Sequence, residues 1–259
     1  MNSKKKMFIA GAMAAAFAVS GQFVQFDIAG TPSFGSVKTA EAGLGSLGGL
    51  AKTVAGKALK VDVDSLQGNK ESMLLNLYKA SLYYAEAAID VSEALGLDDG
   101  QLAQMKAAMN NLQNDKTNLG AMKKVSETTK LDPAVVEQKS KALMDSGDQD
   151  KINKANELIK KSKSARQAAN KYKLLAGKDA AKIISGSAKA LASGSSLGDK
   201  LQVVQELSST AKSAKSVTDA IGSNHKDLTT ALKAYEKQNN IGAVSDDQAE
   251  KDMKNAGLS

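Results

Sequence analysis

Hydrophobic positions between Glu71 and Leu97 recur at steps of three and four residues, which is the period of an α-helix. One series runs along Leu74, Leu77, Ser81, Tyr84, Ala88, Val91 and Leu95, and a second runs beside it along Leu75, Tyr78, Leu82, Ala85 and Ile89. Because small or apolar residues cover most of the circumference, we expect this helix at the centre of a bundle. The polar positions form one narrow stripe: Asn76, Lys79, Tyr83, Glu86, Asp90 and Glu93.

Capping signals predict where further helices begin. In each signal a short polar side chain can accept hydrogen bonds from the free N–H groups of a first helical turn. The predicted starts are Asp98 or Asp99, Asp132 before Pro133, Asp148, and Ser245 in the box Ser245-Asp246-Asp247-Gln248. Between the first two starts, Lys116 and Gly120 predict a break in the helix.

The second half of the chain continues the helical pattern. A seam from Ala155 to Ala176 predicts a long helix that ends or bends at Gly177. Leu197–Ile221 is the next expected helix, and Ser223-Asn224 predicts the cap of a separate, shorter one. Small residues that recur every four positions predict the close approach of another helix; these are Gly186, Ala190, Gly194 and Gly198.

Composition supports the same fold class. The chain has only two prolines and lacks alternating strand-like runs, so we predict an all-α protein, an elongated or compact antiparallel multi-helix bundle with coiled-coil-like seams. The expected organisation is a signal peptide (1–42), a flexible Gly-rich segment (43–69) with Val61 and Val63 extended, the helical bundle (70–240), and a polar, frayed C-terminal tail (241–259).

The N-terminal residues predict export. Lys4, Lys5 and Lys6 precede an apolar segment of 14 residues, Met7–Ser20. This segment is shorter than the ~20 residues of a spanning helix and has the layout of a signal peptide. Ala40-Glu41-Ala42 offers the small-x-small cleavage pattern, with cleavage after Ser20, or an uncleaved amphipathic anchor, as the alternatives. We therefore expect a periplasmic or extracellular protein.

Few residues point to catalysis. The chain has no cysteine and one histidine, His225, which we expect on the surface at a helix start. No G-x-x-x-x-G-K-[ST] loop occurs, and the short matches to G-x-G-x-x-G at residues 43–48 and to G-x-S-x-G at residues 194–198 lack the predicted strand that must precede either motif in a functional site. Glu86, Asp90 and Glu93 share a helix face, but partner helices lack the Glu-x-x-His motif of carboxylate metal bundles. We therefore predict no catalytic residue, metal or cofactor.

Charge is distributed unevenly along the chain, whose net charge is +7. Residues Lys151–Lys189 hold ten lysines and one arginine against two acids, whereas Gly43–Gly100 holds five lysines against eight acids. Either these segments face one another, or the basic one binds an acidic protein, an anionic lipid or a cell-wall polymer. Arg166 is the sole arginine, which argues against specific nucleic-acid recognition.

The candidate partner-binding residues combine both segments: Lys160, Lys161, Lys163, Arg166, Lys171, Lys173, Tyr83, Glu86 and Asp90. Tyr83, on the polar stripe, is either a binding anchor or a residue that covers a neighbouring helix. Three functions fit these features. They are a non-catalytic structural or surface-binding protein of the bacterial cell envelope, a carrier of a lipid or other apolar ligand between helices, and a membrane-active amphipathic protein.

Overall fold

The computed structural model describes residues 62–192 and 200–258, and every regular element in them is an α-helix. The predicted all-α class is therefore confirmed. The helices are α2 (Val63–Leu95), α3 (Asp99–Asn114), α4 (Leu119–Thr128), α5 (Pro133–Asp145), α6 (Gln149–Ala192), α7 (Leu201–Gln238) and α8 (Asp246–Asn255). The predicted signal peptide, with Ala40 and Ala42, lies outside the described residues.

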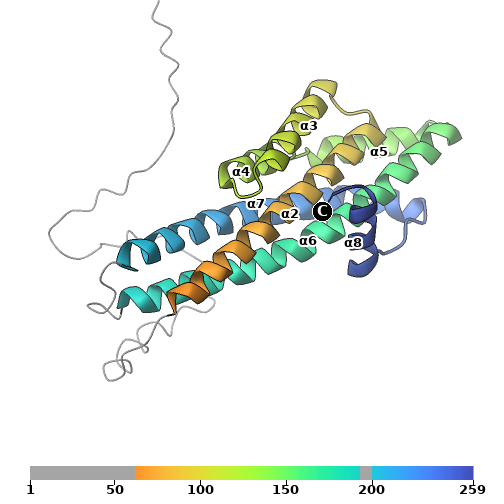
Figure 1. Ribbon diagram of the computed structural model, residues 1–259. Coiled ribbons are helices and arrows are strands. Elements are labelled where there is room, and N and C mark those ends of the chain that lie inside the picture. Colours follow the sequence, from red (N-terminus) through yellow and green to blue (C-terminus); the bar gives the residue numbers. More distant parts are fainter. Residues whose placement is uncertain (1–61, 193–199, 259) are drawn as a thin grey trace, which may run out of the picture. The chain divides into compact units, whose positions relative to one another are not determined.

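Three long helices form the frame of the bundle (Figure 1). Helix α2 packs most extensively against α6, and the two are antiparallel, since Ser72 contacts Asp179 whereas Asp90 contacts Lys161. Helices α6 and α7 are antiparallel as well, so that α7 runs parallel to α2. Helices α3 and α4 pack on α2, α4 and α5 also pack on α7, and α8 packs on α6.

The capping signals of the sequence operate as predicted. The Asp98 carboxylate accepts from the Gln101 N–H at 2.7 Å, and Asp132 accepts from Ala134 ahead of the Pro133 helix. Asp148 accepts from Lys151 at 3.1 Å, and Ser245 accepts from Gln248 at 3.2 Å. The helix break predicted near Lys116 also occurs, between α3 and α4.

The apolar seams of α2 form the core, as expected. Most of their residues are buried, although Leu75 remains 49% exposed. The close approach predicted for small residues is confirmed at Gly186 of α6, where an added Cβ would lie 2.5 Å from Cδ2 of Leu66 on α2. Gly194 and Gly198 lie outside the described residues.

Neither of the predicted helix ends, at Gly177 and before Ser223, occurs. Helix α6 continues through Gly177, which packs against Thr218 of α7, and α7 continues through Ser223 and Asn224. Asn224 is buried inside α7 and donates to the backbone oxygen of Ser126 on α4 at 2.7 Å. A tertiary hydrogen bond thus uses the amide that the sequence suggested as a cap.

Both ends of the predicted bundle domain also differ from expectation. Val63 is helical rather than extended, because Asp62 caps α2 and accepts from the Ser65 N–H at 3.1 Å. Residues 63–69 therefore belong to α2, not to a flexible segment. At the other end, α8 packs against α6 and buries Ala249 and Met253, so the C-terminal residues are docked rather than frayed.

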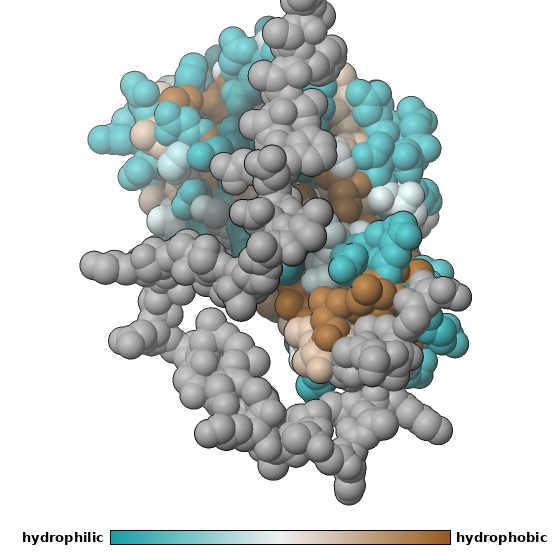
Figure 2. Space-filling view, turned by 90° about the vertical axis from the view of Figure 1, so that its left-hand side faces the viewer, coloured by the Kyte–Doolittle hydropathy of each residue, from teal (hydrophilic) through white to brown (hydrophobic). Residues whose placement is uncertain are grey.

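The end of the bundle where α2 and α7 begin and α6 ends presents apolar surface. Figure 2 faces this end and shows a brown hydrophobic region among hydrophilic side chains. Leu191 near the end of α6 and Leu201 at the start of α7 are 39% and 43% exposed. Within the two described ranges, no helix has the length and apolar character needed to cross a bilayer.

Candidate functional site

The α2 polar stripe, formed by Asn76, Lys79, Tyr83, Glu86, Asp90 and Glu93, is contacted by other helices along its length. At its N-terminal end, Asn76 and the neighbouring Ser72 both donate to Oδ2 of Asp179 on α6, at 3.4 and 2.8 Å. At its C-terminal end, Glu93 lies 2.6 Å from Lys106 of α3. The stripe therefore joins α2 to α6 at one end and to α3 at the other.

Tyr83 lies in the middle of the stripe and is buried, with 3% exposure. Its ring meets Tyr172 of α6 edge to face, with 5.7 Å between centroids, and its hydroxyl donates to the backbone oxygen of Leu258 at 3.2 Å. Burial raises the pKa of Tyr83, and the negative charge of Glu250 adds to this effect. Tyr83 thus covers neighbouring elements, and an exposed binding anchor does not agree with its burial.

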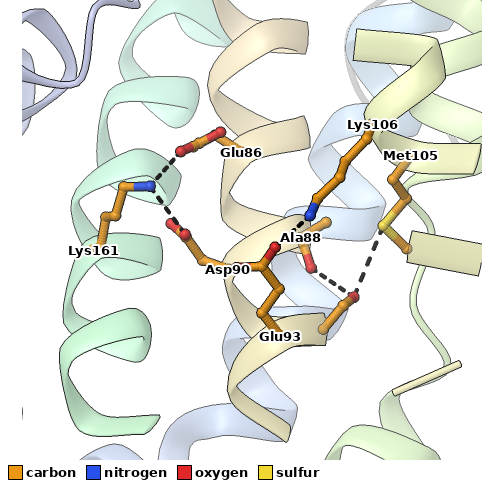
Figure 3. A network of polar contacts seen from close by, with 8 residues as sticks. Glu86, Ala88, Asp90, Glu93, Met105, Lys106 and Lys161 are labelled. Carbon is orange, nitrogen blue, oxygen red and sulfur yellow. Dashed lines mark hydrogen bonds and ion pairs between the residues drawn. The ribbon is translucent and has the colours of Figure 1, made fainter. Parts of the chain in front are cut away.

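Glu86, Asp90 and Lys161 form an ion-pair cluster between α2 and α6 (Figure 3). The Lys161 ammonium donates to Oε1 of Glu86 and to Oδ1 of Asp90, the latter at 3.1 Å. The Asp90 side chain is only 3% exposed, whereas that of Lys161 is 42% exposed. The cluster therefore has a buried carboxylate side and a solvent-facing ammonium side.

The electrostatics of this cluster centre on Asp90. Burial raises the pKa of Asp90 to about 7, the Lys161 charge opposes this shift, and the nearby carboxylates of Glu86 and Glu93 add to it. Burial opposes the charged form of Lys161, but its hydrogen bonds and charge attraction to Glu86 and Asp90 together outweigh this effect and raise the pKa of Lys161. Asp90 consequently titrates near neutral pH inside a helix interface.

A second buried cluster joins α6 to α7 through Arg166. Its guanidinium, 3% exposed, donates to Oε1 of Glu236 and to the Thr229 hydroxyl, the latter at 3.0 Å. Lys163 donates to the other oxygen of Glu236 at 2.6 Å and to the backbone oxygen of Ile241 at 3.0 Å. One buried carboxylate thus receives two cations from successive turns of α6.

His225 lies within α7, half-buried, and not at a helix start on the surface as the sequence suggested. Burial, together with the positive charges of Arg166 and Lys173, lowers the pKa of His225 to about 4. His225 is therefore neutral at physiological pH.

Helix α8 is held on α6 by a row of polar contacts that the sequence did not reveal. Glu250 accepts from the Tyr172 hydroxyl at 2.5 Å and from Lys171 at 3.1 Å. Asp252 accepts from Ser164 at 2.7 Å, and Asp246 from Gln167 at 2.6 Å. Polar residues of the predicted C-terminal tail thus pair with the polar outer face of α6. The sequence does not show these pairs, because they depend on the position of α8 on α6.

The structure places the nine candidate partner-binding residues in two groups. Seven contribute to contacts within the bundle: Tyr83, Glu86, Asp90, Lys161, Lys163, Arg166 and Lys171. Lys160 is exposed and enters none of the ion pairs found in the described residues, and Lys173 lies half-buried beside Gly222 of α7. Of the ten lysines and one arginine in residues 151–189, four thus join α6 to α2, α7 and α8 through ion pairs: Lys161, Lys163, Arg166 and Lys171.

In the part of the chain that the structure describes, no three side chains of His, Asp or Glu gather where they could hold a metal ion. The clusters of Asp90 and Arg166 consist of paired charges, which can orient helices and respond to pH. Comparison of the chain with protein-family models, curated proteins and solved structures finds no match.

Proposed function

We propose that the chain is an exported, non-catalytic helical-bundle protein of the bacterial cell envelope that acts by binding or as a structural component. The observation that carries this proposal is the use of the buried charged groups. Glu86 and Asp90 pair with Lys161, and Arg166 pairs with Glu236, so these groups join helices to one another. Such pairing supports a structural role for these charged groups. The binding function of the protein then belongs to its outer surface.

The export part of the proposal rests on the sequence. Lys4–Lys6, the apolar Met7–Ser20 and the Ala40-Glu41-Ala42 pattern follow the order of a signal peptide. The absence of cysteine is compatible with an oxidising compartment.

The interior favours binding at the surface over carriage of an apolar ligand. Between α2 and α6, the Leu66 side chain occupies the space beside Gly186. A hollow of about 350 Å³ lies instead at helix ends, where Leu97, Gln101 and Val135 help to line it. A carrier needs space between long helices, so close packing at the α2–α6 interface argues for the interaction role.

Fractionation of the cells that make the protein, combined with identification of its N-terminal residue, tests this function. We expect recovery from the periplasm, the envelope or the medium with Gly43 at the N-terminus. Crosslinking in intact cells should then capture a partner from the same compartment. Recovery only from the cytosol with an intact Met1 would overturn the export proposal.

A further inference from the structure

The outer face of α7 carries a line of lysines. Lys212, Lys215, Lys226, Lys233 and Lys237 are all exposed, and they are separated by 3, 11, 7 and 4 residues. Each separation is close to a whole number of turns at 3.6 residues per turn, so the five side chains share one face. From the first to the last, this line extends roughly 37 Å along the helix.

A sixth lysine reaches this line from α6. At Gly222, between Lys215 and Lys226, α7 has no side chain, and Lys173 lies across the position. A Cβ added at Gly222 would be 3.5 Å from Cδ and 3.6 Å from Nζ of Lys173. Glycine therefore lets an α6 lysine contribute to the surface of α7. We call these six residues the α7 basic face: Lys173, Lys212, Lys215, Lys226, Lys233 and Lys237.

Of the five α7 lysines, only Lys215 forms an ion pair within the described residues. Asp219 pairs with Lys215 at 2.6 Å, whereas Glu236 is buried and occupied by Arg166 and Lys163. On α6, Lys161, Lys163, Lys171 and Lys182 each pair with a carboxylate, whereas Lys154, Lys160, Lys178 and Lys189 enter none of the ion pairs found in the described residues. The density of lysine along the sequence pointed to α6, and the structure adds a row of mostly unpaired lysines on α7.

We propose that the α7 basic face binds the surface of an anionic lipid bilayer. A straight line of lysines on a cylindrical helix can touch a flat surface along its whole length, and each lysine near anionic headgroups adds attraction. Two exposed leucines accompany the line. Leu201, 43% exposed, precedes Lys212 by 11 residues and so shares its face, and Leu174, 53% exposed, follows Lys173. These side chains can reach the boundary between headgroups and acyl chains.

The composition of the face favours lipid over other polyanions. It contains neither arginine, which forms bidentate contacts with phosphate, nor an aromatic ring on which a base stacks. Lysine acts as a hydrated point charge, which suits dispersed headgroups that need no fixed geometry. The inference deepens the proposed function, since it names the surface that an envelope protein of this kind binds.

Vesicle sedimentation with the full protein, as recovered from its own cells, tests the inference. The vesicles are phosphatidylcholine with or without phosphatidylglycerol. The variant K212Q/K226Q/K233Q removes three charges from the basic face. The matched control K124Q/K130Q/K154Q removes three exposed charges carried by α4, α6 and the segment after α4. All six side chains are exposed, so both variants are expected to fold, which circular dichroism checks.

We expect binding only to vesicles with phosphatidylglycerol, at least about tenfold weaker binding by the α7 variant, and nearly unchanged binding by the control. High salt should release the protein. Equal weakening in both variants would overturn the inference in favour of bulk charge, and absence of vesicle binding would overturn it outright. Binding to soluble polyphosphate but not to vesicles would overturn the bilayer as the ligand of the α7 basic face in favour of a soluble polyanion. Because purified protein is used, these failures are distinct from a failure of export.

Discussion

The ammonium group of Lys161 lies 3.1 Å from Oδ1 of Asp90, while Oδ2 of Asp90 has no hydrogen-bond partner among the described residues. The carboxylate is thus half satisfied in a buried position. Burial raises the pKa of Asp90 to about 7 despite the nearby cation. The main contact between α2 and α6 therefore contains a group whose charge changes close to neutral pH.

Asp90 should make the stability of the bundle depend on pH. In the unfolded chain an aspartate loses its proton near pH 4, but in the folded protein Asp90 keeps it up to about pH 7. Folding thus takes up a proton in this window, so the Asp90 contribution to stability falls as pH rises from about 4 to 7. We expect the Tm of Asp90→Asn, measured relative to that of the wild type, to be a few degrees higher at about pH 8 than at pH 5.

Thermal unfolding followed by circular dichroism at several pH values measures this difference. Glu71→Gln is the matched control, because it removes an exposed carboxylate from the same helix about five turns before Asp90. Its pH profile should follow that of the wild type. An Asp90→Asn profile that runs parallel to the wild type would show that Asp90 does not titrate in this window.

The Arg166–Glu236 pair should be sensitive to removal of one partner. Both side chains are buried, so Glu236→Ala leaves the guanidinium with an uncompensated charge, and we expect a loss of about 3–5 kcal/mol in the free energy of unfolding. The double variant Arg166→Met/Glu236→Leu should lose less than the single one, because the only charge left without its partner is that of Lys163, whose side chain is partly exposed. Urea unfolding measures both values.

An exposed pair provides the comparison. Lys215 and Asp219 lie one turn apart on α7 and are largely solvent-exposed, so Lys215→Ala should change stability by less than about 1 kcal/mol. If Glu236→Ala lowered the free energy of unfolding as little as Lys215→Ala does, the Arg166 cluster would not hold α6 to α7 in the way the geometry indicates.

Local signals in the sequence predicted much of this fold. The seams of α2 identify core residues because periodic apolar spacing reports burial, and Asp98, Asp132 and Asp148 mark helix starts because capping needs only neighbouring residues. Asn224 shows a limit of prediction from neighbouring residues. Its sequence context suggests a cap, but its amide donates to Ser126 on another helix, and the helix continues.

The candidate site was harder to predict because ion pairs depend on the register between helices. The excess of lysine in residues 151–189 does not reveal that Lys161 meets Asp90 or that Lys163 meets Glu236. The lysines of α7 are sparser along the chain, yet they stay on the surface. Their spacing of whole turns was a signal in the sequence, and it gains meaning once α7 is known to continue through Gly222.

Two glycines should respond in opposite directions to substitution. A side chain at Gly186 would meet Leu66 of α2, so Gly186→Leu is expected to destabilise the bundle by about 1–3 kcal/mol through overpacking. Gly68, in α2, has open space at its Cβ position, and Gly68→Ala should stabilise by roughly 0.5–1 kcal/mol because alanine favours the helix. Urea unfolding measures both. Gly186→Leu/Leu66→Ala should recover part of the loss, and failure to do so would contradict the assigned contact.

Helix α8 is attached to the bundle by a small apolar contact and by polar pairs. Met253 is fully buried, and Tyr83 donates to the backbone oxygen of Leu258 just beyond the helix. Glu250 adds its contacts with Tyr172 and Lys171. Because few buried side chains hold so short a helix, α8 should detach without unfolding the three long helices.

Met253→Asp is expected to detach α8, since it places a charge in a buried apolar site. Amide hydrogen exchange should then accelerate in residues 246–255, while α2 and α7 keep their protection.

Burial raises the pKa of Tyr83, so loss of its cover should lower that pKa toward the ordinary tyrosine value, measurable by absorbance titration. Lys251→Asp, on the exposed side of the same helix, is the matched control and should leave both measurements unchanged. Loss of protection throughout α2 in Met253→Asp would instead make α8 part of the cooperative core.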